Sequence, residues 1–546
     1  MNRYSSCIGA AVSGLALSFA VLYTVFPLAW VALVPLFFAL DKTSPRQASR
    51  TGFCTGLTLS VFAFGWMIPG AGAFTGGPMI YGIAIFLLCS IMFSLGWAML
   101  CRIFVWLRRR HRSSLKQTFL VAALWTLTEA ALQWTAQSMP WFLFHIGNAL
   151  SENLYAIQPI SYIGVGGACF ILIFVNYGFA QALIHRSWKR SLLPFLTIAA
   201  YMLLGWSLLS SFETPARAAE TIPRPPSRAA ATHRGPGTFT ISLIAPNTPP
   251  EIRWDESNGN RLVSQLLDLE RQAVSTHPDI IGWSESAIPW TYRPDDDLIR
   301  EVTHISDSAK ITHISDSAKI THILGINTES AANEIYNSAY CLLPGGVVAG
   351  RYDKNVPLLL IERSWNGWSI PFFSSNGYTV RPGGSGPGSQ LRSDLPLNTP
   401  YGKAGILICN ESALPAEAAD RVRHGAQFLF NMSNDGWFRD TYLVPQHFYN
   451  ARLRAVETRK DLVVNSNLGW SGLVTASGRI IEVRHSDVPF ISTLSIHPND
   501  LQPLAVSYPC LPVACSLLIV LLFVLSSITR PQNLFRHHFP NHKPIK

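Results

Sequence analysis

The 546-residue sequence predicts a multi-pass α-helical membrane region of about eight spans joined to an exported α/β domain. Apolar runs close to the ~20 residues that a bilayer-spanning helix needs recur along the first 211 residues and once more near the C-terminus. Between them, short apolar runs alternate with helical patterns, which is typical of an α/β domain. The expected organisation is seven helices at 1–211, a linker at 212–236, the α/β domain at 237–500, an eighth helix at 507–530 and a basic tail at 531–546.

The predicted spans agree with the distribution of basic residues. The spans are the runs at 7–22, 25–40, 52–69, 78–100, 118–136, 158–183, 191–211 and 508–529. Seventeen of the 43 Lys and Arg residues lie in five flanking segments, 1–7, 41–51, 101–117, 184–192 and 529–546. The alternate loops, 70–77 and 138–157, contain neither. Because positive loops stay in the cytoplasm, both termini are expected there and residues 212–507 on the opposite side.

The net charge of +10 does not indicate a nucleic-acid partner, because the basic residues form short bands beside apolar runs. The first apolar run is also compatible with a cleavable signal peptide, but a second run follows at once and favours an uncleaved helix.

Glu129 is an acid inside a predicted span, which is compatible with a functional role or with a carboxylate hydrogen-bonded inside the bundle. A disulfide between Cys341 and Cys409 is possible on the exported side.

The segment from 238 onward is predicted to form strands and helices. The Pro- and Arg-rich stretch 212–236 before it has no apolar period and is a linker. Helical patterns lie at 257–275 and 442–459, and a tandem repeat, THISDSAKI, occupies 303–311 and 312–320. Predicted strands are 238–245, 279–285, 320–327, 338–344, 404–410, 426–433, 461–467 and 471–477.

Three strand ends in the sequence carry a group suited to catalysis, and the one before Lys354 is a further short strand. Glu285 follows IIGW, Lys354 follows AGRYD, and Cys409 follows GILI. Loops beyond strand ends are where α/β proteins build active sites. A thiol can attack, a carboxylate can accept its proton, and an ammonium can stabilise an oxyanion. Taken singly, the same residues are compatible with a packed cysteine and two solvated loop charges.

Glutamate, lysine and cysteine in this chain order resemble the carbon–nitrogen hydrolase (nitrilase) superfamily, and residues 431–480 resemble its C-terminal half. The resemblance implies a nitrilase-like α-β-β-α sandwich for 237–500. FPLAWVALVPLFFAL (26–40), ALWTLTEAALQW (123–134) and APNTPPEIRWD (245–255) are similar to segments of one membrane-embedded family, the bacterial apolipoprotein N-acyltransferases. The resemblance covers nearly the whole chain.

The family resemblance implies Glu285 as general base, Lys354 as oxyanion-stabilising group and Cys409 as nucleophile. It implies transfer of an acyl chain from a membrane phospholipid, through a cysteine thioester, to the N-terminal amine of a diacylglyceryl-cysteine lipoprotein. The expected place is the bacterial inner membrane, with the catalytic domain on the periplasmic side. No cofactor and no metal are expected. Supporting or substrate-binding roles are implied for Glu362, Glu411, Trp254, Asn434 and Trp437.

The sequence departs from the family in two places. Asn410 follows the cysteine where the family usually has tyrosine, and the stretch after Lys354 reads NVPLLLIERSW, so Glu362 matches by spacing alone. The apolar stretch 358–373 is compatible with a lipid-facing loop or with core packing. Three other functions stay open: a membrane-tethered amidase acting on a soluble amide, a non-enzymatic transporter or scaffold, and a member that has lost its catalytic activity.

Overall fold

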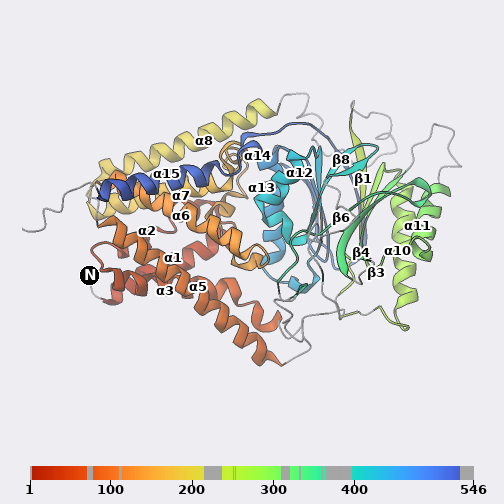
Figure 1. Ribbon diagram of the computed structural model, residues 1–546, viewed down its shortest axis with the longest axis horizontal. Helices are drawn as coiled ribbons and strands as arrows, with labels where there is room; N and C mark the ends of the chain where they lie inside the picture. Colours follow the sequence, from red (N-terminus) through yellow and green to blue (C-terminus); the bar gives the residue numbers. More distant parts are fainter. Residues whose placement is uncertain are drawn as a thin grey trace, which may run out of the picture.

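The computed structural model divides into an all-helical part and a part with two β-sheets, which lie side by side along the long axis (Figure 1). It describes residues 3–70, 78–109, 113–213, 237–249, 251–252, 254–308, 320–330, 334–359, 361–363, 380 and 396–528. Residues 214–236 of the predicted linker, 309–319 of the repeat, Trp365, Trp368, Phe372 and Phe373 of the apolar stretch, and the basic tail lie outside these ranges.

Every predicted span contains helix, and three helical segments are long and apolar enough to cross a membrane: Met79–Arg108, Ile160–Ile184 and Trp188–Phe212. The count of about eight spans therefore stays a prediction. The long helices are α1 (Arg3–Leu22), α3 (Pro45–Phe64), α5 (Met79–Arg108), α6 (Ser114–Ala136), α7 (Ile160–Ile184), α8 (Leu192–Phe212) and α15 (Leu511–Ile528).

The second predicted span, 25–40, is not one continuous helix. It forms a 3₁₀ helix, η1 (Phe26–Trp30), and a short α-helix, α2 (Val34–Ala39), each with a proline in its first turn. Proline lacks the N–H that a continuing helix needs, so the run breaks there. Buried side chains replace the lost bonds: Leu33 N donates to Asn176 Oδ1 at 2.8 Å, and Leu36 N donates to Ser13 Oγ at 2.7 Å.

The remaining elements form two sheets. The first has the strand order β13-β1-β2-β4-β5-β6, with β3 paired to β4, and the second has the order β12-β11-β10-β9-β8-β7. The first sheet contains β1 (Phe239–Ala245), β2 (Ile280–Trp283), β3 (Ile288–Thr291), β4 (Thr321–Glu329), β5 (Ile335–Leu343), β6 (Val347–Asp353) and β13 (Phe490–Ile496). The second contains β7 (Leu397–Thr399), β8 (Gly402–Ile408), β9 (Phe428–Asn434), β10 (Leu462–Asn467), β11 (Ser471–Val474) and β12 (Ile480–Arg484).

The two sheets face each other across a buried apolar layer that includes Ile241 of one sheet and Phe430 of the other. Helices α10 (Gly259–Ser275) and α11 (Asp297–Ser308) cover the outer face of the first sheet. Helices α12 (Pro415–Arg423), α13 (Leu443–Thr458) and the short α14 (Leu504–Ser507) cover the second and lie between it and the helical part (Figure 1). The result is a four-layer α-β-β-α sandwich.

Helix α13 joins the sandwich to the helical part through buried polar contacts. Arg459, directly after the helix, donates to Gln158 Oε1 at 2.8 Å and to Ser161 Oγ at 3.0 Å. Arg452 donates to Ser151 O at 2.8 Å. Glu457 accepts the backbone N–H of Val165 at 3.1 Å, where α7 is kinked. Because these charged groups are buried and hydrogen-bonded across the junction, they fix how the two parts sit against each other.

Candidate active site

The thiol of Cys409 is held on a sharp strand-to-helix turn. Cys409 follows β8 directly and begins a 3₁₀ helix, η7 (Cys409–Ala413), with a φ of +54°. A left-handed backbone is unfavourable for a residue with a Cβ, and such strain is often retained at functional sites. The carbonyl of Cys409 accepts hydrogen bonds from His447 Nε2 at 2.8 Å and from Ser412 Oγ at 3.1 Å. The turn is therefore fixed from both sides. Cys409 and Cys341 are both free thiols.

Glu285 lies just beyond the end of β2 and is buried. Its Oε1 accepts a hydrogen bond from Asn337 Nδ2 at 2.7 Å and contacts Lys354 Nζ at 3.3 Å. Burial raises the pKa of Glu285, because the charged form loses solvation, and the nearby Lys354 only partly opposes this shift. A carboxylate with a raised pKa is a stronger base, which suits it to accept a proton from a thiol.

Gly325 of β4 lies directly against the backbone of the loop that carries Glu285, where a side chain would not fit. A Cβ on Gly325 would lie 2.3 Å from Ser284 O and 3.0 Å from the Cα of Glu285. Gly325→Ala is expected to push this loop out of place and destabilise the protein by about 1–3 kcal/mol. Thermal unfolding measures the loss. Gly259→Ala is the matched control, because a Cβ there meets open space. Equal stability of the two variants would contradict the expectation.

Lys354 lies between two carboxylates. Its Nζ donates to Glu362 Oε1 at 2.9 Å and contacts Glu285 Oε1 at 3.3 Å, and its side chain is fully buried. Burial alone would lower the pKa of Lys354, but Glu285, Glu362 and Cys409 together raise it well above its usual value. The amine is therefore a fixed positive charge.

The pKa of the Cys409 thiol is raised well above its usual value, first by burial and then by the charge of Glu285, while Lys354 acts in the opposite direction. Glu285 and Lys354, which contact each other at 3.3 Å, thus both act on the charge state of this thiol. The resting thiol is thus protonated, and a base must remove its proton before or during attack. Glu285 is the carboxylate with the largest electrostatic effect on this thiol.

Glu362 belongs to this cluster, although only its spacing from Lys354 indicated it. Its Oε1 accepts from Lys354 Nζ, and its Oε2 accepts the N–H of Leu358 at 2.6 Å. The carboxylate therefore holds both the amine and the loop that follows it.

Glu411 has a different position, behind the reacting groups. It is fully buried and accepts the N–H groups of Ile408 at 2.8 Å and Asn355 at 2.7 Å, together with the hydroxyl of Tyr352 at 2.8 Å. It thereby ties the end of β8 to the loop after Lys354. Asn410 adds to the same junction, because its Nδ2 donates to Val356 O at 3.0 Å.

The remaining predicted residues lie at different places. Trp254 packs its ring against Trp290, 5.4 Å away between centroids, beside the core under α10 and α11. Asn434 ends β9 and accepts from Asn467 Nδ2 at 3.0 Å. Trp437 lies in the 3₁₀ helix Gly436–Phe438, and its side chain lies outside the described part of the chain.

Sequence reasoning missed His447, which connects Asp435 to the cysteine turn. Its Nδ1 lies 2.8 Å from Asp435 Oδ1, and its Nε2 lies 2.8 Å from the carbonyl of Cys409. Both neighbours are acceptors, so these contacts favour the imidazolium, in which both ring nitrogens carry hydrogen. Burial would lower the pKa of His447, but the charge and hydrogen bond of Asp435, the hydrogen bond to the Cys409 carbonyl and the charge of Glu285 together outweigh it and raise the pKa. His447 lies within the helical pattern QHFYNARLRAVET (446–458), but no sequence feature links this pattern to Cys409.

Two family models match the chain: the apolipoprotein N-acyltransferase N-terminal domain over residues 13–178, and carbon–nitrogen hydrolase over residues 248–502. A curated apolipoprotein N-acyltransferase of Geobacter metallireducens is 27% identical over 455 residues, which are 83% of this chain and 82% of that protein. The chain belongs to the apolipoprotein N-acyltransferase family.

Other relatives carry the same family name. The apolipoprotein N-acyltransferase of Vibrio parahaemolyticus is 25% identical, covering 84% of this chain and 85% of its own length. That of Chlorobaculum tepidum is 26% identical, covering 90% and 91%. The chain is therefore a membrane protein of the acyltransferase class that carries a carbon–nitrogen hydrolase domain.

For this member of the family, the His447 contacts predict a pH-dependent contribution to stability. Because the pKa of His447 is raised in the folded state, the stabilisation is complete below the unfolded value of about 6.5 and is lost as the pH rises through the folded value. His447→Gln is expected to cost about 1–2 kcal/mol at pH 6 and less at alkaline pH. Denaturant unfolding at several pH values measures this cost. Asp435→Asn should move the loss to lower pH, and a cost that does not vary with pH would refute the assignment.

Proposed function

We propose that the protein transfers an acyl chain from a membrane phospholipid to the N-terminal amine of a diacylglyceryl-cysteine lipoprotein through a thioester on Cys409. One observation supports this more than any other. On a chain of the N-acyltransferase family, the strained turn at Cys409 places its thiol within the electrostatic reach of Glu285 and Lys354.

In the first half-reaction, Cys409 Sγ attacks the ester carbonyl of the phospholipid, and Glu285 accepts the thiol proton. Lys354 stabilises the oxyanion of the tetrahedral intermediate. When the intermediate collapses, the carbon–oxygen bond breaks and the lysophospholipid leaves with the proton from Glu285. The products are the acyl thioester and a lysophospholipid. The raised pKa of the thiol makes a base essential for this step.

In the second half-reaction, the α-amine of the lipoprotein attacks the thioester, and Glu285 accepts a proton from the amine. The carbon–sulfur bond breaks, an amide forms, and the thiolate recovers its proton from Glu285. In each half-reaction Glu285 thus first accepts a proton and then returns it. Asn337 and Lys354 hold its Oε1 in place through both.

The location we propose is the bacterial inner membrane, with about eight spans, both termini in the cytoplasm and the sandwich on the periplasmic side. The basic segments at 41–51, 101–117 and 184–192 support this orientation. So does the arrangement of the fold, since the sandwich adjoins one end of the helical part (Figure 1). Both substrates carry lipid anchors, and this placement gives both access to the same site.

The test separates the two half-reactions. The purified full-length protein is incubated with phospholipid alone, and its intact mass is measured. We expect a mass increase of one acyl chain, sensitive to hydroxylamine, which peptide mapping assigns to Cys409 and not to Cys341. Adding a diacylated lipopeptide should discharge the adduct and make the lipopeptide heavier by the same mass. If folded protein forms no adduct, the proposal fails, and an amidase or an inactive member replaces it. Hydrolysis of a soluble amide without lipid would identify the amidase.

A further inference from the structure

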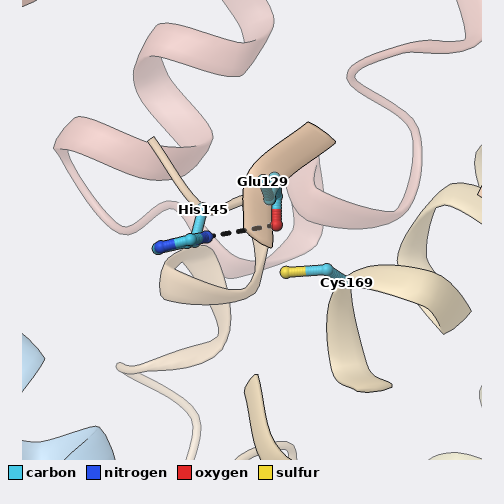
Figure 2. Close-up of side chains that lie close together, drawn as sticks. All are labelled: Glu129, His145 and Cys169. Carbon is cyan, nitrogen blue, oxygen red and sulfur yellow. Dashed lines mark hydrogen bonds and ion pairs between the residues drawn. The ribbon is translucent and has the colours of Figure 1, made fainter. Parts of the chain in front are cut away.

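Glu129, His145 and Cys169 converge inside the helical part (Figure 2). They come from α6, from the segment before the 3₁₀ helix Ile146–Leu150, and from α7. All three are buried, and their potential ligand atoms lie within 4.8 Å of one another. Sequence spacing could not reveal this cluster, because its members are 16 and 24 positions apart on separate elements.

We infer that Glu129, His145 and Cys169 form a structural binding site for a divalent zinc-class cation. Carboxylate, imidazole and thiolate are the ligand types that bind zinc in proteins. Tetrahedral zinc with its usual bond lengths separates neighbouring donor atoms by about 3.3–3.5 Å. His145 Nδ1 and Glu129 Oε2 are already 3.2 Å apart, so a cation needs only small shifts of these side chains.

The surroundings orient the donor atoms in the way that metal ligands are usually oriented. Trp125 Nε1 and Ile146 N both donate to Glu129 Oε1, at 2.8 and 3.1 Å, which leaves Oε2 directed at His145. The N–H of Gly147 donates to Cys169 Sγ at 3.3 Å, a contact that favours a thiolate. Hydrogen bonds of this kind fix ligands in known metal sites.

The charge balance also favours a cation. Among the described residues, His145 is the basic side chain that contacts Glu129, and its Nε2 is buried without a hydrogen-bond partner. A neutral imidazole would leave a buried carboxylate with no cation, and an imidazolium would leave a buried charged N–H unpaired, both of which are costly. A divalent cation with one carboxylate, one thiolate and a neutral imidazole has no net charge.

Such a site would fix the segment between α6 and α7 against the acyltransferase site. Ala136 and Leu143 of this segment pack against Val356 and Leu414, which follow Lys354 and Cys409 in their respective loops. Ser138 O also accepts the N–H of Leu359 at 2.9 Å. The cation would therefore act as a structural brace and take no part in the reaction.

The test measures metal directly and does not depend on activity. Full-length, tag-free protein with Cys409→Ala, so that the active-site thiol cannot contribute, is purified in detergent and its metal content is determined by mass spectrometry. We expect about one zinc ion per chain. After chelation, Co²⁺ should bind and give a thiolate-to-cobalt charge-transfer absorption.

The variants assign the ligands. Cys169→Ser should abolish the charge-transfer band, and His145→Gln should abolish tight binding. Trp125→Phe, which removes the hydrogen bond to Glu129 Oε1, should weaken binding by about 10–100-fold. Cys101→Ser is the matched control, because Cys101 is a buried free thiol of α5 outside the cluster. The inference is overturned if the parent protein binds neither added Zn²⁺ nor Co²⁺, or if the band persists in Cys169→Ser.

Discussion

Cys409→Ala is expected to abolish acyl transfer, with a loss of at least about 10⁴-fold. The reason is that the proposed reaction passes through a bond to Cys409 Sγ. Glu285 and Lys354 remain in the variant, but neither supplies a replacement nucleophile, because Lys354 is held as an ammonium between two carboxylates. The measurement is the mass of a diacylated lipopeptide after incubation with phospholipid and each protein.

Cys341→Ser is the matched control for this experiment. Cys341 is also a buried free thiol of the sandwich, on β5, and its Sγ lies 3.6 Å from Asn398 O. Its replacement should cost some stability and leave the transfer reaction intact. Cys409→Ser should fold but react slowly, because a hydroxyl has a higher pKa than a thiol. Transfer by Cys409→Ala at a rate near that of Cys341→Ser would rule out the thioester pathway.

Lys354→Met is expected to lower both activity and stability. Activity should fall by about 10²–10³-fold, because the oxyanion loses its cation. Stability should fall by about 3–5 kcal/mol at neutral pH, because Glu285 and Glu362 are left as neighbouring carboxylates without their ammonium. Without the ammonium that opposes it, the rise in the folded pKa of Glu285 is larger. The variant should therefore regain stability as the pH falls and Glu285 is protonated, while its activity stays low.

The double variant Lys354→Met/Glu362→Gln separates the two effects. Removing one of the two carboxylates should recover much of the lost stability, since Glu285 no longer faces a second negative charge. It should recover none of the activity. Denaturant unfolding and lipopeptide acylation of the four proteins in this cycle give both quantities. If activity returns together with stability, Lys354 has only a structural role in the site.

The sandwich was largely predictable, because its buried strands are short apolar runs. β1, β4, β9 and β10 lie within two residues of their predicted ranges. The edge strand of the second sheet was harder to predict, because β12 (Ile480–Arg484) is mostly exposed and has no continuous apolar run. In the helical part, the run at 25–40 has the composition of a span, but its prolines divide it into two short helices whose free backbone groups bond to Ser13 and Asn176. Hydropathy does not report such tertiary partners.

The candidate site could be predicted from the sequence where a reactive side chain comes directly after a strand. Glu285 and Cys409 each follow an apolar strand in the sequence and Lys354 follows β6, and the fold brings Lys354 into contact with Glu285. Glu362 was indicated by spacing, and its contact with Lys354 gives that spacing a physical meaning. His447 could not be found in this way, because it acts through a backbone carbonyl 38 positions away. Contacts of that kind leave no pattern in a single sequence.

Helix α13 has a mechanical consequence for the whole protein. Its N-terminal half carries His447, which holds the carbonyl of Cys409, and its last turn carries Glu457, which accepts a hydrogen bond at the kink of α7. A 16-residue helix is a stiff rod of about 24 Å. A change in the tilt of α7 would therefore be transmitted along α13 to the backbone of Cys409, the nucleophile that we propose. We expect the proposed reaction to depend on the thickness of the surrounding bilayer, independently of the phospholipid proposed as acyl donor.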